Sequence, residues 1–103
     1  MGYNVIFNKQ SLVDLQRIND YLFSKWGIST IKKFHKKLEE FKSTIVKNPQ
    51  IGVVCVKTKE REIRQYPVTK QNLIIYSVAK TNIRILRVFD ARQHPDKKIT
   101  GIK

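Results

Sequence analysis

The amino-acid sequence predicts a single α+β domain, in which a strand is followed by an antiparallel helical hairpin and then by a three-stranded antiparallel meander. Three observations carry this prediction: a period-two apolar pattern at the start, two long segments whose apolar residues recur every three or four positions, and three short apolar runs separated by polar turns. With 103 residues, of which 41% are hydrophobic, the chain can build one core. No internal repeat or linker divides it, so we expect residues 1–103 to form one domain.

The first expected element is a half-buried strand. Tyr3, Val5 and Phe7 recur at every second position, which is the period of a strand with one buried face. The pattern stops at Asn8, after which the spacing of apolar residues becomes helical.

Two amphipathic helices are expected between Lys9 and Asn48. Gly27 is predicted to end the first helix as a left-handed cap, and Ser29 to cap the second helix. The Asn48-Pro49 pair is predicted to stop the second helix, because the residue before a proline disfavours the helical conformation. A linker of about three residues should make the pair an antiparallel hairpin. The apolar stripes are Leu12, Leu15, Ile18, Leu22 and Trp26 in the first helix, and Ile31, Phe34, Leu38, Phe41 and Ile45 in the second.

The second half of the chain is expected to form the sheet. Segments 63–68, 73–79 and 83–89 are apolar runs joined by the short polar turns 69–72 and 80–82, which favours an antiparallel meander. The middle run is apolar on both faces, so it should be the central strand. The β-branched segment 52–56 is interpreted as a loop or a short edge strand.

Charge is the strongest compositional signal. The chain has 21 Lys and Arg against 8 Asp and Glu, a formal net charge of +13 at pH 7, which indicates an acidic partner. If the hairpin covers one sheet face, the other face is free to present arginines, whose planar fork suits phosphate and carboxylate. The residues expected to converge on that face and to bind the target are Arg64, Arg87 and Arg92, with Lys57, Arg61 and Arg84 as secondary members.

The composition argues against redox, metal-dependent and membrane functions. The single cysteine allows no intramolecular disulfide and no zinc-binding cysteine cluster, so a reducing, cytoplasmic location is expected. No apolar run approaches the roughly 18 to 20 residues of a membrane span, and no signal-peptide pattern is present. Neither a glycine-rich phosphate loop nor a metal-ligand spacing occurs, so no metal, cofactor or membrane contact is expected.

Four side chains of types that can take part in catalysis are interpreted mainly as structural or surface residues. Cys55 lies among valines and is expected to be a small buried hydrophobe. His35 is expected to be solvated on the second helix. Tyr76 is expected in the core, with a partner for its hydroxyl. His94 follows the last predicted strand and is expected to be a loop residue, with a catalytic role as the alternative.

The order and spacing of these elements resemble the RelE/ParE toxin superfamily over residues 3–97. The resemblance implies the toxin of a bacterial type II toxin–antitoxin pair, which arrests growth until a co-expressed antitoxin neutralises it. An acidic, partly disordered antitoxin segment that folds on binding would cover both the arginine-rich face and the helical hairpin. The residues that carry the resemblance are Tyr3, Val5, Phe7, Asp14, Leu15, Ile18, Tyr21, Asn48, Pro49, Gly52, Ile63, Arg64, Ile75, Tyr76 and the segment 85–92.

The superfamily has two branches with different mechanisms. The RelE-like branch cleaves mRNA on the ribosome, using cations at alternate positions of the first meander strand, an Arg on the middle strand, another after the last strand, and a C-terminal Tyr or His. This chain has Glu62 and Arg64 at the alternate positions and Leu73 near the middle one. Arg92 matches the last Arg, whereas His94 lies closer to the strand than the family's aromatic. Each missing donor at such a site costs roughly 10² to 10³ in rate.

We therefore expect a ParE-like toxin that binds and poisons DNA gyrase without chemistry of its own, and we assign no catalytic residue. One alternative is a RelE-like, metal-independent endonuclease that cleaves ribosome-bound mRNA, with Arg64, Arg92 and His94 as its catalytic candidates. The other is a non-toxic, basic nucleic-acid-binding module, which would explain the net charge equally well but lacks an exposed aromatic platform.

Overall fold

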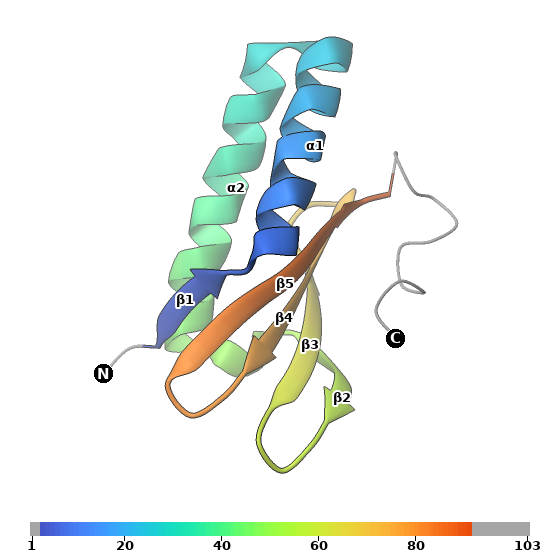
Figure 1. The fold of residues 1–103 in the computed structure, drawn as a ribbon. Helices are drawn as coiled ribbons and strands as arrows, with labels where there is room; N and C mark the ends of the chain where they lie inside the picture. The colour runs from blue at the N-terminus through green and yellow to red at the C-terminus, as the bar shows by residue number, and fades with distance from the viewer. Residues whose placement is uncertain (1–2, 92–103) are drawn as a thin grey trace.

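In a computed structural model, the protein folds as a helical hairpin packed on one face of a five-stranded sheet (Figure 1). The structure describes residues 3–91. The α+β order predicted from the sequence is confirmed. The elements in chain order are β1 (Asn4–Phe7), α1 (Lys9–Trp26), α2 (Ile28–Lys47), a short 3₁₀ helix η1 (Pro49–Ile51), β2 (Val53–Lys57), β3 (Glu62–Pro67), β4 (Asn72–Val78) and β5 (Asn82–Asp90).

The sheet has the strand order β1-β5-β4-β3-β2. Strands β3, β4 and β5 form the predicted antiparallel meander, and β4 is its central strand. Strand β1 pairs with β5 in parallel, and β2 pairs with β3 as an antiparallel edge strand. The segment that the sequence left open between a loop and an edge strand is therefore an edge strand.

The junctions of the hairpin are tighter than predicted. Helix α1 begins after Asn8, whose side chain accepts a hydrogen bond from the Ser11 N–H at 2.8 Å. Gly27 alone joins the two helices, with φ of +88° and ψ of −169°. The prediction that Ser29 caps α2 is wrong, because α2 begins at Ile28 and has no side-chain cap. Glycine permits this one-residue reversal, since other residues are strained at positive φ.

Helix α2 buries the predicted stripe, whereas helix α1 is rotated from its prediction. Leu12 and Trp26 were predicted to lie in the core, but they are 54% and 50% exposed. The buried side of α1 instead begins with two polar residues that make hydrogen bonds. It consists of Ser11, Asp14, Ile18 and Leu22. Apolar spacing alone misplaced the face, because polar residues occupy part of the packed surface.

The two faces of the sheet are assigned by cross-strand register, because directly paired residues point to the same side. Tyr76 pairs with Arg64 and with Ile85, and this first face packs under the hairpin. Ile75 pairs with Arg87, and Ser77 pairs with Arg84, on the second face.

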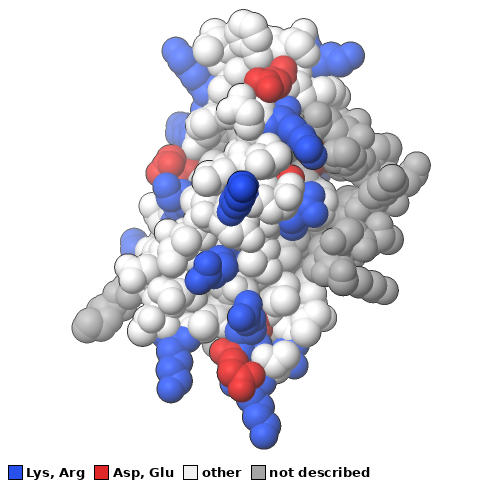
Figure 2. Space-filling view, in the orientation of Figure 1, with Lys and Arg blue, Asp and Glu red and all other residues white. Residues whose placement is uncertain are grey.

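The expected convergence of the basic residues on one free face is wrong. Arg64 lies on the first face, together with Lys57, which pairs with Glu62. Arg84 and Arg87 lie on the second face. Figure 2 shows Lys and Arg spread over the visible side of the molecule rather than gathered in one patch. The strands of the meander alternate their side chains between the two faces, and the cross-strand register places Arg64 of β3 on one face and Arg84 and Arg87 of β5 on the other.

Candidate functional site

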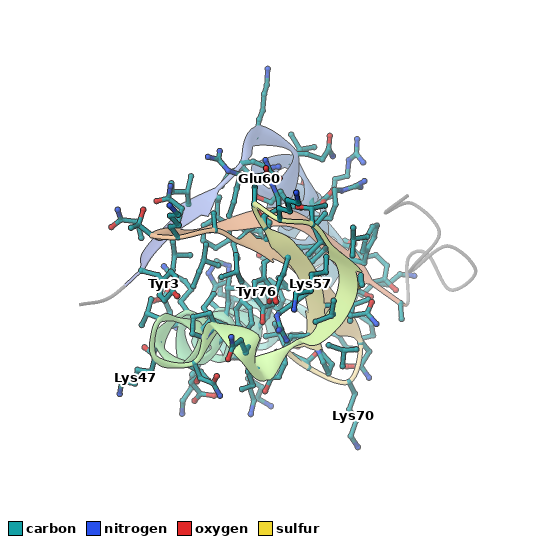
Figure 3. The ribbon with its side chains drawn as sticks, turned by 90° about the horizontal axis from the view of Figure 1, so that it is seen from below. Tyr3, Lys47, Lys57, Glu60, Lys70 and Tyr76 are labelled. Carbon is teal, nitrogen blue, oxygen red and sulfur yellow. The ribbon has the colours of Figure 1, made fainter. Side chains whose placement is uncertain are left out.

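Tyr76 is the centre of a buried polar network at the end of the sheet next to η1. Its side chain is fully buried, and its hydroxyl accepts a hydrogen bond from the Gly52 N–H at 2.9 Å and donates one to the Pro49 carbonyl at 2.8 Å. Figure 3 shows Tyr76 in the interior, while Lys47 and Lys70 point away from it. Burial raises the pKa of the Tyr76 hydroxyl, and the Gly52 N–H offsets part of that rise. The neutral phenol therefore fastens the start of β2 to the centre of the sheet.

Gly52 is required where β2 begins, because no side chain fits there. A Cβ atom at this position would lie 2.7 Å from the Gln65 carbonyl oxygen and 2.7 Å from the Tyr76 hydroxyl. The backbone of residue 52 thus approaches β3 and Tyr76 as closely as the packing allows. This close packing explains why glycine occupies position 52, one of the residues that carry the resemblance described in the sequence analysis.

The guanidinium group of Arg64 is committed to contacts within the protein. Its Nε donates to Glu62 Oε1 at 2.8 Å, and its Nη1 donates to the carbonyl oxygens of Gln50, at 3.0 Å, and of Gly52. The side chain is only 11% exposed. The hydrogen bond from Arg64 lowers the pKa of Glu62, so this carboxylate stays ionised at neutral pH. Arg64 therefore joins β3 to the η1–β2 segment.

Arg87 is held in an ion pair within the protein, and 31% of its side chain is exposed. Its Nε and Nη2 donate to the two carboxylate oxygens of Asp14, at 2.8 and 3.2 Å. Asp14 also accepts the Val88 N–H at 2.9 Å, and its side chain is 5% exposed. The guanidinium lies 4.8 Å from the centre of the Phe89 ring. Arg87 and Asp14 therefore fasten α1 to β5 at the point where β5 has passed the end of β1.

Three of the predicted target-binding residues are exposed. Arg84 is exposed on the second face, and Arg61 is exposed in the turn between β2 and β3. The Lys57 side chain is 70% exposed, with its Nζ 3.6 Å from Glu62. The remaining candidates, Arg92 and His94, lie outside the described residues 3–91.

Cys55 does not have the environment that the sequence predicted. It is exposed rather than buried, because β2 is an edge strand whose side chains are not covered by a second layer. It lies at the irregularity in the pairing of β2 with β3, and its Sγ is 3.8 Å from the Val53 carbonyl. Desolvation by its neighbours raises the pKa of the thiol. A raised pKa is the opposite of what a nucleophilic cysteine requires.

The remaining predictions concern histidine, metal and membrane. His35 is exposed as expected, and its Nε2 lies 2.9 Å from Asn19 Oδ1 on the neighbouring helix. Within the described part of the chain, no group of three or more His, Cys, Asp or Glu side chains is placed to hold a metal ion. In the same residues, no helix has the length and apolar character needed to cross a membrane.

Two features were missed by reasoning from the sequence. Asp14 was noticed only as part of a resemblance, although its position on the buried side of α1 makes it the partner of Arg87. Phe23 and Ile28 were not singled out, yet they are 60% and 59% exposed beside Trp26. A signal was available for Phe23, because it lies off the predicted apolar stripe of its helix.

A strand, a helical hairpin and an antiparallel meander, in this order, are the fold that the sequence resemblance to the RelE/ParE superfamily implied. A family model described as the ParE toxin of the type II toxin–antitoxin system parDE matches residues 5–95. The chain therefore belongs to the ParE toxin family of type II toxin–antitoxin systems.

Solved structures show the same fold. The chain is similar to a structure described as the chromosomal ParDE toxin–antitoxin system from P. aeruginosa, with 16% identity and a TM-score of 0.68, over 85% of this chain and 95% of that one. It is also similar to a structure of the YoeB dimer from Staphylococcus aureus, with 18% identity and a TM-score of 0.55, over 84% and 94% of the two chains. A search of curated proteins found no match. At these identities the structural likeness concerns the fold alone.

Proposed function

We propose that this ParE-family toxin arrests bacterial growth in the cytoplasm by binding and poisoning DNA gyrase, without cleaving RNA, and that a cognate antitoxin neutralises it. The single observation that carries the proposal is the internal commitment of Arg64. An endonuclease of the RelE type would need this guanidinium free to stabilise charge on a phosphate. Here it is bound to Glu62 and to two backbone carbonyls, with 11% of its side chain exposed.

Three other positions support the same interpretation. Glu62 stands where the RNA-cleaving branch has a cation, and its negative charge would repel a phosphate. Leu73, near the position of the middle-strand arginine, has no donor to offer. The pKa of Tyr76 is raised and its hydroxyl is already bonded on both sides. Tyr76 is therefore not available as an acid or base for RNA cleavage, and the Glu62 carboxylate is bound by Arg64.

The antitoxin is proposed from charge. The exposed side chains Lys57, Arg61 and Arg84, in a chain of net charge +13, favour an acidic segment that orders itself on the toxin. The same three cations are proposed to steer the toxin toward its target, whereas Arg64 and Arg87 are proposed to maintain the fold. Association with the antitoxin should be fast and should weaken as salt is raised.

The test combines purified toxin with DNA gyrase, supercoiled plasmid and ATP, and in a parallel reaction with ribosomes and a defined mRNA. We expect linear DNA from trapped gyrase–DNA cleavage complexes, and intact mRNA. Prior addition of the product of the neighbouring reading frame should abolish the effect on gyrase. Cleaved mRNA in the ribosome reaction, with gyrase unaffected, would establish the RelE-like alternative instead.

A further inference from the structure

Three large apolar side chains are exposed together where α1 meets α2. Phe23, Trp26 and Ile28 are 60%, 50% and 59% exposed, and we call them the hairpin-end cluster. Phe23 and Trp26 are three residues apart on α1, so their side chains are neighbours on the helix surface. Ile28 is the first residue of α2, separated from Trp26 by Gly27 alone. Exposed aromatic residues in such a group mark interaction sites on soluble proteins.

The cluster lies at the end of the molecule that projects from the sheet. Figure 1 shows the α1–α2 junction at the opposite end of the hairpin from β2. The Gly27 N–H donates to the carbonyls of Leu22 and Phe23, at 3.1 and 3.0 Å, which fixes the last turn of α1. The Trp26 ring makes an edge contact with Tyr21, with 5.8 Å between ring centres. Trp is among the residue types enriched in binding hot spots.

The charge around the cluster indicates what kind of surface it fits. Residues 17–37 include six Lys or Arg and a single Asp. Figure 2 shows this end of the molecule as mostly uncharged surface, with basic side chains on both sides and an acidic side chain just below the top. The complementary surface is an apolar cleft edged by carboxylates. A second copy of this chain does not fit, because it would bring the same basic residues against one another.

We propose that the hairpin-end cluster is the surface with which the toxin binds its protein target, by inserting Phe23 and Trp26 into an apolar cleft edged by acidic side chains. The inference rests on the proposed function only in requiring that the toxin acts by binding a protein. A toxin that acts in this way needs anchor residues, and Arg64 and Arg87 are engaged within the fold. Among residues 3–91, the hairpin-end cluster holds the exposed large aromatic side chains.

The test is the double variant F23S/W26S, with L12S as the matched control. Leu12 is also on α1 and is 54% exposed, but it lies at the other end of the helix. Growth arrest on induction, affinity for purified gyrase and affinity for the antitoxin are measured for each protein, together with thermal unfolding and sedimentation. We expect the double variant to lose growth arrest and to bind gyrase at least about 30-fold more weakly. Its antitoxin affinity should stay within about threefold of the unsubstituted protein, and L12S should resemble the unsubstituted protein throughout.

Three results would overturn the inference. In the first, F23S/W26S arrests growth fully. In the second, it loses the antitoxin but keeps the target, which would make the cluster an antitoxin-binding surface. In the third, the unsubstituted protein sediments as a dimer and the double variant as a monomer. Failure of the gyrase proposal is recognised separately, because the unsubstituted toxin would then arrest growth without binding gyrase. In that case, loss of growth arrest in the double variant would still support the hairpin-end cluster as the target-binding surface.

Discussion

The two ends of this toxin use similar residue types in opposite ways. At the sheet end, Tyr76, Arg64 and Glu62 are residues that often serve in catalysis or binding, yet each is engaged inside the protein. At the hairpin end, Phe23 and Trp26 are residues that often form a core, yet more than a third of each is exposed. The comparison teaches that partners and exposure, rather than residue type, separate the structural positions from those available to another protein.

The comparison also explains why the structure tolerates an exposed aromatic cluster. The fold is fastened near the sheet, where Asp14 joins α1 to β5 and Tyr76 joins β2 to β4. The end of the hairpin contributes little to these contacts. Substitutions should therefore have large effects on stability near the sheet and small ones at the hairpin end.

The largest loss of stability is expected for Asp14→Ala. This substitution removes the carboxylate that binds both Arg87 and the Val88 N–H, so both donors lose this acceptor. We expect a loss of about 3 kcal/mol in the free energy of unfolding. Asp20→Ala is the control, because Asp20 is exposed on the same helix. Urea denaturation of both proteins measures the difference, and equal stabilities would contradict the structural role of the Arg87 ion pair.

Gly52→Ala should follow, with a loss of about 2 to 3 kcal/mol. The added methyl group would meet the Gln65 carbonyl and the Tyr76 hydroxyl at 2.7 Å. Gly27→Ala meets open space, but the φ of +88° and ψ of −169° at this position are essentially restricted to glycine, so a loss of about 1 to 3 kcal/mol is expected there. Thermal unfolding of the two variants gives the order, and a more stable Gly52→Ala protein would show that the approach of β2 is looser than described.

Tyr76→Phe should cost about 2 kcal/mol at neutral pH, because the buried Gly52 N–H and the Pro49 carbonyl lose their shared partner. The pKa of Tyr76 is raised in the folded protein. Its stabilising contribution is therefore complete below the unfolded pKa, about 10, and is lost as pH rises toward the folded value. Denaturation at pH 8 and at pH 10 to 11 should show the two proteins converging in stability. A constant difference across this range would argue against a buried, protonated phenol.

The smallest change in stability is expected at the hairpin end. Phe23→Ser removes a side chain that is 60% exposed, so the free energy of unfolding should change by no more than about 0.5 kcal/mol. Calorimetry of this variant beside the unsubstituted protein measures the change. A loss as large as that of Tyr76→Phe would mean that Phe23 belongs to the core, and the comparison between the two ends would fail.

Much of the fold could be predicted from the sequence, because apolar periodicity records which side of each element is buried. The stripe of α2 and the central position of β4 are examples. The rotation of α1 could not be predicted in this way, since Ser11 and Asp14 are buried through hydrogen bonds that periodicity does not register. The parallel pairing of β1 with β5 depends on contacts between distant segments, which local patterns do not contain.

The candidate site was harder to predict than the fold. Counting charges predicted a basic surface, but the sequence does not say which guanidinium has an internal acceptor. The pairing of Arg64 with Glu62 follows from their spacing on one strand. The pairing of Arg87 with Asp14 joins residues 73 positions apart and required the three-dimensional structure. Cys55 was misplaced because its valine neighbours suggested a buried side chain, whereas the side chains of the edge strand β2 are exposed.

The most direct test of the central claim is to induce the toxin alone in growing bacteria and to follow DNA synthesis, protein synthesis and transcript integrity over the first minutes. Co-expression of the antitoxin is the control and should abolish every effect. If the toxin acts by binding gyrase, DNA synthesis stops first while transcripts remain intact. Transcripts cut on ribosomes before DNA synthesis slows would contradict the account, and would mean that Arg64 leaves its internal partners to act on RNA.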